Sequence, residues 1–402
     1  MGNIVIIGAG QAAGQCIMSL KKMGNENPIV LIGEESHPPY QRPPLSKSYL
    51  EGKVGLERVY MKDKEFYEEN GVEFLANTLV TKIDRENNKI LTSNEKEISY
   101  EKLVICTGSR VRKIDIGKKD LNNVFYLRTI DDVNSLKESI KDSKNISIIG
   151  AGYIGLEVAA VANGLGMNVS VFEMADRSMN RTVDPEISYY FENLHKEKGV
   201  AFHFNSQIKE FNGEGLISSI KIKDGTQIDT DILVIGIGIL PNQELAEESG
   251  LDCDNGIIVD NRGKTSDPSI FSCGDCTNHP NKFLNKRIRL ESVQNALEQS
   301  KVVAANLVGV DKTYEEIPWF WSDQYDQKLQ IVGMPDQYDE IVRRDSQVGF
   351  SLFYLKESTI ISVTTVNNPR EFLICKKLVE KKVKISSDIL KDESKDLNEL
   401  VK

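Results

Sequence analysis

Two glycine-rich segments of the chain carry the same residue types at the same spacing. The first reads Gly8-x-Gly10-x-x-Ala13 and the second Gly150-x-Gly152-x-x-Gly155. In such a turn the first glycine permits a tight bend, the second lets a pyrophosphate approach the backbone, and the small third residue lets a helix pack on a strand. Free N–H groups at the helix start then favour a bound anion. Each segment therefore predicts a dinucleotide site, with contacts from Gly8, Gly10 and Ala13 in the first and from Gly150, Gly152, Tyr153, Ile154 and Gly155 in the second.

An acidic residue follows each glycine turn, close to the end of the next apolar segment. Glu34, or Glu35 as its alternative, follows the first turn, and Glu173 follows the second. A carboxylate roughly 20 residues beyond the turn hydrogen-bonds the ribose hydroxyls and repels a 2′-phosphate. The second site is therefore predicted to prefer NADH over NADPH, with the nearby Arg177 as the residue that would weaken this preference.

The elements that must hold these turns form an internal repeat. Residues 3–10 recur in similar form as residues 145–152. Each turn is predicted to connect an apolar strand to a helix (12–22 and 153–165), and a second strand follows (28–32 and 168–172). Further strands, at 102–106 and 231–236, also end in glycine turns. Such βαβ alternation predicts parallel, doubly wound sheets.

The pattern changes at residue 318. Alternating polar and apolar residues at 329–332, 341–344, 349–355 and 359–366 are typical of an antiparallel sheet. The predicted fold class is therefore α/β, with two Rossmann-like dinucleotide-binding domains, one inserted in the other, and a C-terminal α+β domain. Two dinucleotides imply a permanently held FAD on the N-terminal copy and a visiting NADH on the inserted copy. The predicted ranges are 1–108 with 236–317 for the FAD domain, 109–235 for the NAD domain and 318–402 for the C-terminal domain.

Composition and charge exclude several other classes of protein. The chain has 402 residues, of which 40% are hydrophobic and 27% charged, and a formal net charge of −10, which argues against a nucleic-acid partner. No apolar run approaches the roughly 18 residues that span a bilayer, and residues 1–7 lack the features of a signal peptide. Six scattered cysteines suit reduced thiols, so we expect a cytoplasmic protein without a membrane partner. The four histidines lack metal-ligand spacing, and no metal is predicted.

The segment 39–47, PYQRPPLSK, closely resembles the PYDRPPLSK segment of the NADH-dependent ferredoxin reductases. These are FAD flavoproteins like putidaredoxin reductase and the reductases of aromatic dioxygenases. The resemblance extends over nearly the whole chain, and Gln41 departs from it where aspartate is usual. It continues through residues 103–110, 127–129, 150–157, 238–242, 270–275, 290–296 and 318–325.

The resemblance implies roles for individual residues. Lys47 would lie near flavin N5 and pair with Glu157, and these two residues are the predicted catalytic pair. Arg42 resembles the contact to the FAD pyrophosphate, for which a guanidinium is well shaped. Trp319 or Trp321 would lie against the isoalloxazine ring. The resemblance further implies FAD contacts from Asp275, at the ribityl chain, and from Thr107, Gly108, Arg128 and Val293.

The cysteines help to predict where the electrons go. Cys273-x-x-Cys276 has the spacing of a redox pair, but Asp275 lies within it, and residues 40–50 lack the cysteine pair of disulfide reductases. We therefore expect hydride transfer from NADH to FAD, followed by electron transfer to a [2Fe–2S] ferredoxin that serves a cytochrome P450 or a Rieske oxygenase. The reductase itself is expected to be a monomer or a weak homodimer. An acidic ferredoxin would need a basic patch, for which Lys286, Arg287, Arg289 and Lys328 are candidates, although a solvated charged turn explains them as well.

Two alternative functions remain open at this point. One is an NADH oxidase or small-acceptor reductase, although an oxidase of the cysteine-sulfenate type would need a cysteine that residues 40–50 lack. The other is an NADH-sensing flavoprotein, in which NADH changes assembly and does not drive turnover.

Overall fold

The computed structural model describes residues 2–115 and 121–401. Met1, residues 116–120 and Lys402 fall within predicted domain ranges but lie outside this described part. The chain forms two compact units. Among the described residues, no helix combines the length and the apolar character that crossing a membrane requires. The first unit comprises Met1–Gln41, Leu56–Arg110 and Leu240–Phe320, and the second comprises Arg42–Gly55, Val111–Ile239 and Trp321–Lys402.

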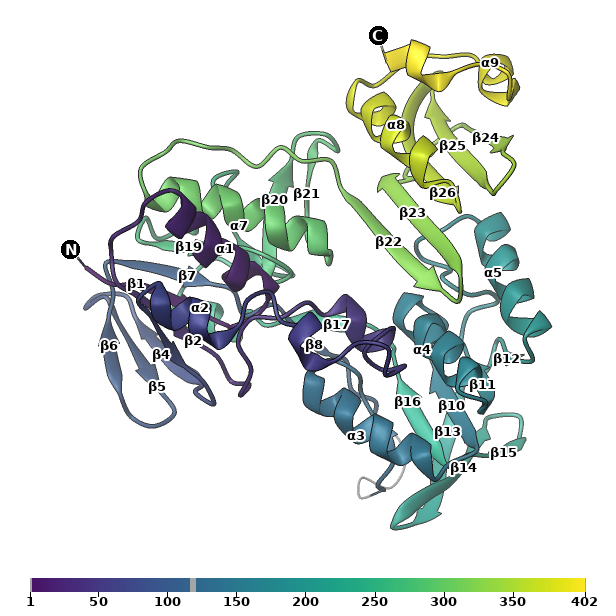
Figure 1. Ribbon diagram of the computed structural model, residues 1–402, viewed down its shortest axis with the longest axis horizontal. Helices are drawn as coiled ribbons and strands as arrows, with labels where there is room; N and C mark the ends of the chain where they lie inside the picture. The colour runs from purple at the N-terminus through teal and green to yellow at the C-terminus, as the bar shows by residue number, and fades with distance from the viewer. Residues whose placement is uncertain (1, 116–120, 402) are drawn as a thin grey trace. The chain divides into compact units, whose positions relative to one another are not determined.

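The first unit is built on a five-stranded sheet in the order β19-β7-β1-β2-β3, whose strand pairs are all parallel. Its strands are short and apolar because both faces of the sheet are covered. Ile4 and Ile6 face the helices α1 and α7, which lie side by side (Figure 1). Val5 and Ile7 face a three-stranded sheet, β4-β5-β6. The bounds are β1 Ile4–Ile7, β2 Ile29–Ile32, β3 Val72–Leu75, β4 Val80–Asp84, β5 Lys89–Thr92, β6 Glu97–Ser99, β7 Lys102–Ile105, β19 Ile270–Ser272, α1 Gln11–Lys22 and α7 Val293–Leu307.

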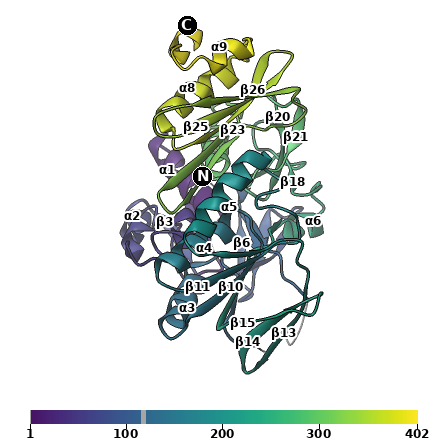
Figure 2. The same cartoon turned by 90° about the vertical axis from the view of Figure 1, so that its right-hand side faces the viewer.

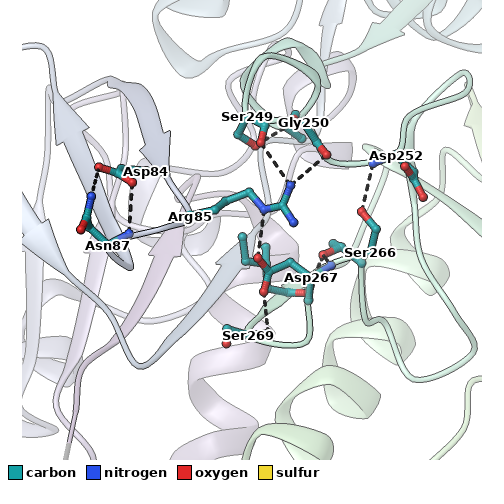
Figure 3. Close-up of polar contacts among 12 residues, drawn as sticks. Asp84, Arg85, Asn87, Ser249, Gly250, Asp252, Ser266, Asp267 and Ser269 are labelled. Atoms are coloured by element: carbon teal, nitrogen blue, oxygen red, sulfur yellow. Dashed lines mark hydrogen bonds and ion pairs between the residues drawn. The ribbon is translucent and has the colours of Figure 1, made fainter.

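An arginine attaches the β4-β5-β6 sheet to the rest of the first unit. Arg85 follows β4, and its Nε atom lies 2.9 Å from Asp267 Oδ2 (Figure 3). The same guanidinium donates to the backbone oxygens of Ser249 and Gly250 at 3.3 and 2.9 Å. The planar guanidinium thus joins the end of β4 to loops that follow it in the chain by more than 150 residues.

The second unit repeats this architecture around the second glycine turn. Its five-stranded sheet has the order β12-β11-β10-β16-β9, again with parallel pairs. An antiparallel three-stranded sheet, β13-β14-β15, shares an apolar cluster with it that includes Ile149, Phe172 and Phe211. The bounds are β9 Val124–Phe125, β10 Asn145–Ile149, β11 Asn168–Phe172, β12 Ala201–His203, β13 Ile208–Glu214, β14 Leu216–Ile222, β15 Gln227–Asp229, β16 Ile232–Ile235, α3 Ile130–Lys141, α4 Tyr153–Gly164 and α5 Pro185–Glu197.

The C-terminal part of the second unit is an antiparallel sheet in the order β22-β23-β26-β25-β24. Helix α8 packs beside β23 and β26 (Figure 2). Helix α5 also contacts this sheet region, because Tyr190 donates to Gln327 at 2.5 Å and Glu186 pairs with Arg343. The bounds are β22 Trp319–Gln324, β23 Gln327–Gly333, β24 Glu340–Asp345, β25 Phe350–Lys356, β26 Thr359–Val366, α8 Pro369–Glu380, α9 Ser387–Lys391 and η3 Leu397–Val401.

This architecture confirms the predicted α/β fold class and all the strands predicted around the two glycine turns. The four predicted C-terminal strands are confirmed as well, whereas β22 and the three-stranded sheets β4-β5-β6, β13-β14-β15 and β18-β20-β21 were not predicted. The three-domain ranges stay a prediction. The remaining elements are η1 Pro43–Ser46, η2 Leu56–Arg58, α2 Lys64–Glu69, β8 Ser109–Val111, β17 Ile239–Pro241, α6 Glu244–Glu248, β18 Ile257–Ile258, β20 Thr277–Asn281 and β21 Lys286–Ile288.

Candidate cofactor and redox site

The first glycine turn has the geometry of an anion cradle. Gly8 has a φ of +96°, and a Cβ atom at this position would lie 2.3 Å from the Cys106 backbone oxygen, so only glycine fits there. Gly10 is the N-cap of α1, and a Cβ atom at Gly10 would meet no atom within 4 Å. Ala13, the third residue of the motif, lies in the first turn of α1 and is fully buried. The first turn of α1 thus begins at open space.

The second glycine turn repeats this geometry. Gly150 has a φ of +101°, and a Cβ atom there would lie 2.3 Å from the Gly236 oxygen. A Cβ atom at Gly152 would again meet nothing within 4 Å, whereas one at Gly155 would lie 2.0 Å from the Gly150 oxygen. Gly155 therefore serves close packing of helix on turn, and Gly152 leaves room for a ligand. Tyr153 and Ile154 open α4 at this point, and Ile154 is 44% exposed.

The helices α1 and α4 differ from other helices of the protein in how they begin. Neither N-cap glycine contributes a side-chain hydrogen bond, and neither helix has an acidic residue in its first turn. By contrast, α2, α3, α5 and α7 are capped by Asp63, Thr129, Asp184 and Ser292, and the uncapped helices α6, α8 and α9 each carry an acidic residue in the first turn. Uncapped N–H groups with positive dipole ends suit a bound pyrophosphate. Both turns therefore fit a dinucleotide.

The predicted ribose-binding acids have different surroundings. Glu173 Oε2 accepts from the backbone N–H of Ala151, inside the second glycine turn, and Oε1 accepts from Ala175, each at 2.9 Å. After the first turn, Glu34 is exposed, whereas Glu35 accepts a 2.6 Å hydrogen bond from Tyr40. The Glu173 carboxylate is thus fixed beside its glycine turn by two backbone donors.

Arg177, which could have favoured NADPH, is held by its own loop. Its Nη1 donates to Val183 O and Ser188 Oγ at 3.0 and 2.7 Å, and its Nη2 donates to Asn180 O at 3.0 Å. A guanidinium engaged in this way is poorly placed to turn toward a 2′-phosphate. This observation strengthens the predicted preference for NADH.

Lys47 and Glu157, the predicted catalytic residues, are in contact. Lys47 Nζ lies 2.7 Å from Glu157 Oε2, and the side chains are 20% and 5% exposed. The same oxygen accepts from Ser46 Oγ at 2.5 Å, and Glu157 Oε1 accepts from Ser322 Oγ at 2.6 Å. Lys47 follows the turn η1, and Glu157 lies one turn into α4. Three donors therefore converge on one buried carboxylate.

The two arginines predicted to contact FAD lie together. Arg42 Nη1 donates to the Arg128 backbone oxygen at 2.5 Å. The Arg128 backbone N–H donates in turn to Asp132, whose side chain belongs to the capping box of α3. The start of α3 thus fixes both arginines in the second unit.

The other predicted FAD residues lie in the first unit. Thr107 Oγ1 donates to Asn242 O at 2.7 Å, and Gly108 has a φ of +63°. Asp275 Oδ2 accepts from Ser109 at 3.1 Å, and Val293 is the first residue of α7. Asn295 lies two positions after Val293 in this helix, and its buried Oδ1 accepts no hydrogen bond from the described residues. An orphaned acceptor beside Val293 is compatible with a polar cofactor edge at this helix start.

The two tryptophans lie on β22 and are both half-buried. Because side chains alternate along a strand, Trp319 and Trp321 share one face of β22, whereas Ser322 and Gln324 lie on the opposite face. Which tryptophan would contact the flavin stays a prediction for either residue.

The cysteines of the predicted Cys273-x-x-Cys276 spacing are free thiols. Both are buried, and Cys273 Sγ lies 3.4 Å from Cys106 Sγ. The hydrogen bond to Cys273, together with burial, raises the pKa of the Cys106 thiol, and burial raises that of Cys276. Buried thiols of raised pKa are poor nucleophiles. Within residues 2–115 and 121–401, no group of three or more His, Cys, Asp or Glu side chains could hold a metal ion.

The candidate basic patch is largely engaged by neighbouring groups. Arg287 donates to Val259 O at 2.7 Å and to Asn278 Oδ1 at 3.2 Å. Arg289 is paired with Glu291, and Lys328 lies 3.0 Å from Asp323. These contacts favour the structural explanation of the charges over a dedicated docking patch.

Sequence reasoning missed three polar residues of the site. Ser46 lies within the segment 39–47 but was given no role, and Ser322 and Asn242 lie far from it in the chain. Asn242 exchanges two hydrogen bonds with Thr107, since its Nδ2 donates to the Thr107 oxygen at 2.9 Å. The sequence signal for Ser322 was its place beside the two tryptophans in the segment 318–325, which resembles the family but gave Ser322 no role.

Known proteins match the chain over its full length. The family model described as pyridine nucleotide-disulphide oxidoreductase matches residues 2–300, and the reductase C-terminal model matches residues 319–401. Putidaredoxin reductase of Pseudomonas putida is 37% identical over 99% of this chain and 96% of its own length. Rhodocoxin reductase of Rhodococcus erythropolis is also 37% identical, over 98% of this chain and 93% of its own.

Solved structures also match the fold over the whole chain. The covalent putidaredoxin reductase–putidaredoxin complex contains a chain that matches with a TM-score of 0.96 and 36% identity, over 100% of this chain and 98% of that one. The ferredoxin reductase for the CYP199A2 system of Rhodopseudomonas palustris matches with a TM-score of 0.95 and 38% identity, over 100% of both chains. The chain therefore belongs to the pyridine nucleotide-disulphide oxidoreductase family and, within it, to the NAD-dependent ferredoxin reductases.

Proposed function

We propose that the protein takes a hydride from NADH onto bound FAD and passes the two electrons singly to a [2Fe–2S] ferredoxin, which serves a cytochrome P450 or a Rieske oxygenase. The observation that carries this proposal is the presence of two open, uncapped glycine turns in one chain, each at the end of a parallel sheet. A flavin supplies the ability to accept electrons in pairs and to release them one at a time. The balance is NADH plus two oxidised ferredoxins giving NAD⁺, one proton and two reduced ferredoxins.

The residues of the chain would bind and orient the two dinucleotides. The first turn, with Arg42, Arg128 and Asp275, is proposed to hold FAD. The second turn, with Glu173 at its edge, is proposed to hold the pyrophosphate and ribose of NADH. Lys47, fixed by Glu157, would stabilise negative charge on the reduced cofactor.

The proposed acceptor is a protein because the thiols are badly suited to carry electrons. Cys106, Cys273 and Cys276 are buried and form no disulfide, and burial and mutual contact raise the thiol pKa values of Cys106 and Cys276. The names of the relatives, which include reductases of putidaredoxin and rhodocoxin, support the same acceptor class. Free thiols also support our proposal that the protein acts in the cytoplasm. We further propose that it acts as a monomer or a weak homodimer.

Anaerobic reduction followed by competition between acceptors tests the proposal. NADH should bleach the flavin absorption of the purified protein, and a [2Fe–2S] ferredoxin should then restore it faster than air-saturated buffer does. Faster reoxidation by air would favour the NADH oxidase. Slow reoxidation by every acceptor, with NADH-dependent dimerisation, would favour the NADH-sensing flavoprotein. Failure of NADH to bleach the flavin would refute all three functions.

A further inference from the structure

A row of buried polar side chains continues from the catalytic pair into β22 and α5. Ser322 Oγ donates to Glu157 Oε1 at 2.6 Å, and Gln324 Nε2 donates to Ser322 Oγ at 3.4 Å. Gln324 Oε1 lies 3.0 Å from His195 Nε2, and His195 Nδ1 lies 3.4 Å from the Tyr325 hydroxyl. Ser322, Gln324 and His195 are all completely buried. We call this row, from Tyr325 to Glu157, the Glu157 chain.

The hydrogen bonds of the Glu157 chain point in one direction. Burial lowers the pKa of His195 to about 4, so the ring is neutral near pH 7 and has one donor and one acceptor nitrogen. Gln324 Oε1 can only accept, so His195 Nε2 carries the hydrogen, and Nδ1 is the unprotonated nitrogen that faces the Tyr325 hydroxyl. Gln324 Nε2, which also faces the Met179 sulfur at 4.0 Å, donates to Ser322. From His195 to Glu157, every donor therefore points toward the carboxylate.

We propose that Ser322, Gln324 and His195 are positioning residues for the Lys47–Glu157 pair. Ser322 occupies Glu157 Oε1, which leaves Oε2 for Lys47 and Ser46. Gln324 and His195 hold the Ser322 hydroxyl in the orientation that donates, and aligned hydrogen bonds strengthen one another in a buried row. Through Ser322 and Glu157, the C-terminal sheet thus fixes the position of the Lys47 ammonium group, which is proposed to lie near the flavin. This inference rests on the proposed function and deepens it.

The composition of the row argues for positioning and against proton conduction. The reaction releases one proton for each NADH oxidised, and a wire of hydroxyls and imidazoles could carry it. Gln324, however, lies in the middle of the row, and an amide cannot pass a proton without changing to its imidic form. At the outer end, the Tyr325 hydroxyl donates its hydrogen to Asn163 Oδ1 at 3.3 Å, and Lys198 Nζ lies 4.9 Å from the centre of the Tyr325 ring.

Single-turnover reduction of the FAD-loaded protein tests this role. Ser322→Ala removes the donor to Glu157, and Gln324→Met breaks the row at nearly constant volume. Ser362→Ala is the control, because Ser362 is also a buried serine of the C-terminal sheet but donates to Val332 O instead. We expect the limiting rate of flavin reduction to fall about tenfold in both row variants, which corresponds to about 1.4 kcal/mol and is close to what one buried hydrogen bond contributes. The apparent NADH affinity should change less than twofold, and Ser362→Ala should change neither value by more than twofold.

The contrary outcomes are distinct. Wild-type rates in Ser322→Ala and Gln324→Met would overturn the inference, as would an equal loss in Ser362→Ala, because that loss would reflect packing alone. Recovery to within threefold in Ser322→Thr, which keeps a hydroxyl, is expected, and its absence in a folded variant would also count against the role. If NADH failed to reduce even the wild-type flavin, the proposed function would fail, and kinetics could not decide the role of the row.

A measurement on the wild-type protein remains decisive in that case, and also if the variants do not fold. Nitrogen-15 NMR of the histidine rings should assign His195 as protonated at Nε2 and unprotonated at Nδ1, without titration between pH 8 and about pH 5.5. Gln324→Met should alter the His195 Nε2–H resonance, and Ser362→Ala should leave it in place. A proton found on Nδ1 would reverse the direction of the row and overturn the inference.

Discussion

Glu173 should determine the preference for NADH, and Glu173→Gln should largely abolish it. The carboxylate is fixed by the backbone N–H groups of Ala151 and Ala175, each at 2.9 Å, beside the second glycine turn. The substitution keeps the size of the side chain and one amide oxygen as an acceptor. It removes the negative charge, and it leaves only one oxygen for two backbone donors and the ribose.

Two contributions determine the expected magnitude. A hydrogen bond to a charged group contributes about 1.5–3 kcal/mol, so the loss of its charged acceptor should lower kcat/KM for NADH roughly tenfold to a hundredfold. For NADPH, the repulsion between the carboxylate and the 2′-phosphate disappears. Two unit charges about 4 Å apart repel by roughly 1 kcal/mol in water and about 4 kcal/mol near a protein surface, so kcat/KM for NADPH should rise about tenfold. The ratio of the two values should therefore fall by at least about a hundredfold.

The assay is flavin reduction by each coenzyme, measured as kcat/KM over a range of salt concentrations. Asp176→Asn is the matched control, since it removes an equal charge from an exposed position in the same loop. We expect it to change the ratio less than threefold. Because Arg177 is held by Val183, Ser188 and Asn180, Glu173→Gln should not make NADPH the better substrate. An unchanged ratio in Glu173→Gln, or an equal change in Asp176→Asn, would refute the assignment of Glu173.

Three further predictions concern other parts of the protein. Lys47→Met and Glu157→Gln should each slow flavin reduction at least tenfold, and the double variant should be no slower than the slower single one, because the two side chains act as one buried pair; additive losses would contradict this. The folded-state pKa of His195, about 4, lies below its usual 6.5, so the unfolded chain binds the extra proton and the free energy of unfolding should fall by up to about 3 kcal/mol between pH 6.5 and 4; urea unfolding should detect this, and His195→Gln should flatten the dependence. Alkylation of the native protein followed by mass spectrometry should label Cys253 first, because the other five cysteines are buried. The labelling should be slow, because burial raises the pKa of Cys253 to about 11, and rapid labelling of Cys273 would contradict the structure.

The parts of the fold that the sequence predicted are those governed by local pattern. The helix and strands around Gly8–Gly10 and Gly150–Gly152 follow from apolar runs, glycine spacing and small residues, all of which act over a few positions. The strand 359–366 was predicted with the bounds that the structure has. By contrast, β4-β5-β6 and β13-β14-β15 are hairpin sheets with many exposed polar residues, so their apolar periodicity is weak.

The candidate site divides in the same way. The partner of Lys47 could be named because both residues lie in segments that resemble a known family. The partner of Arg287 could not, because a basic residue in sequence gives no indication of whether its guanidinium faces solvent or backbone oxygens. In the structure, Arg287 donates to Val259 and Asn278, and this contact depends on strand pairing between β20 and β21.

The strand β22 illustrates what only the three-dimensional structure could supply. Its two faces carry different chemistry, because Trp319 and Trp321 alternate with Ser322 and Gln324. The resemblance of residues 318–325 to the family implied a role for the tryptophans, whereas it implied none for the serine and the glutamine in the same segment. Their role arises from the approach of α4 and α5 to the other face, where Ser322 reaches Glu157 and Gln324 reaches His195. A shift of β22 by one residue would exchange the two faces, so one register fixes both the side on which the tryptophans lie and the orientation of the Glu157 carboxylate.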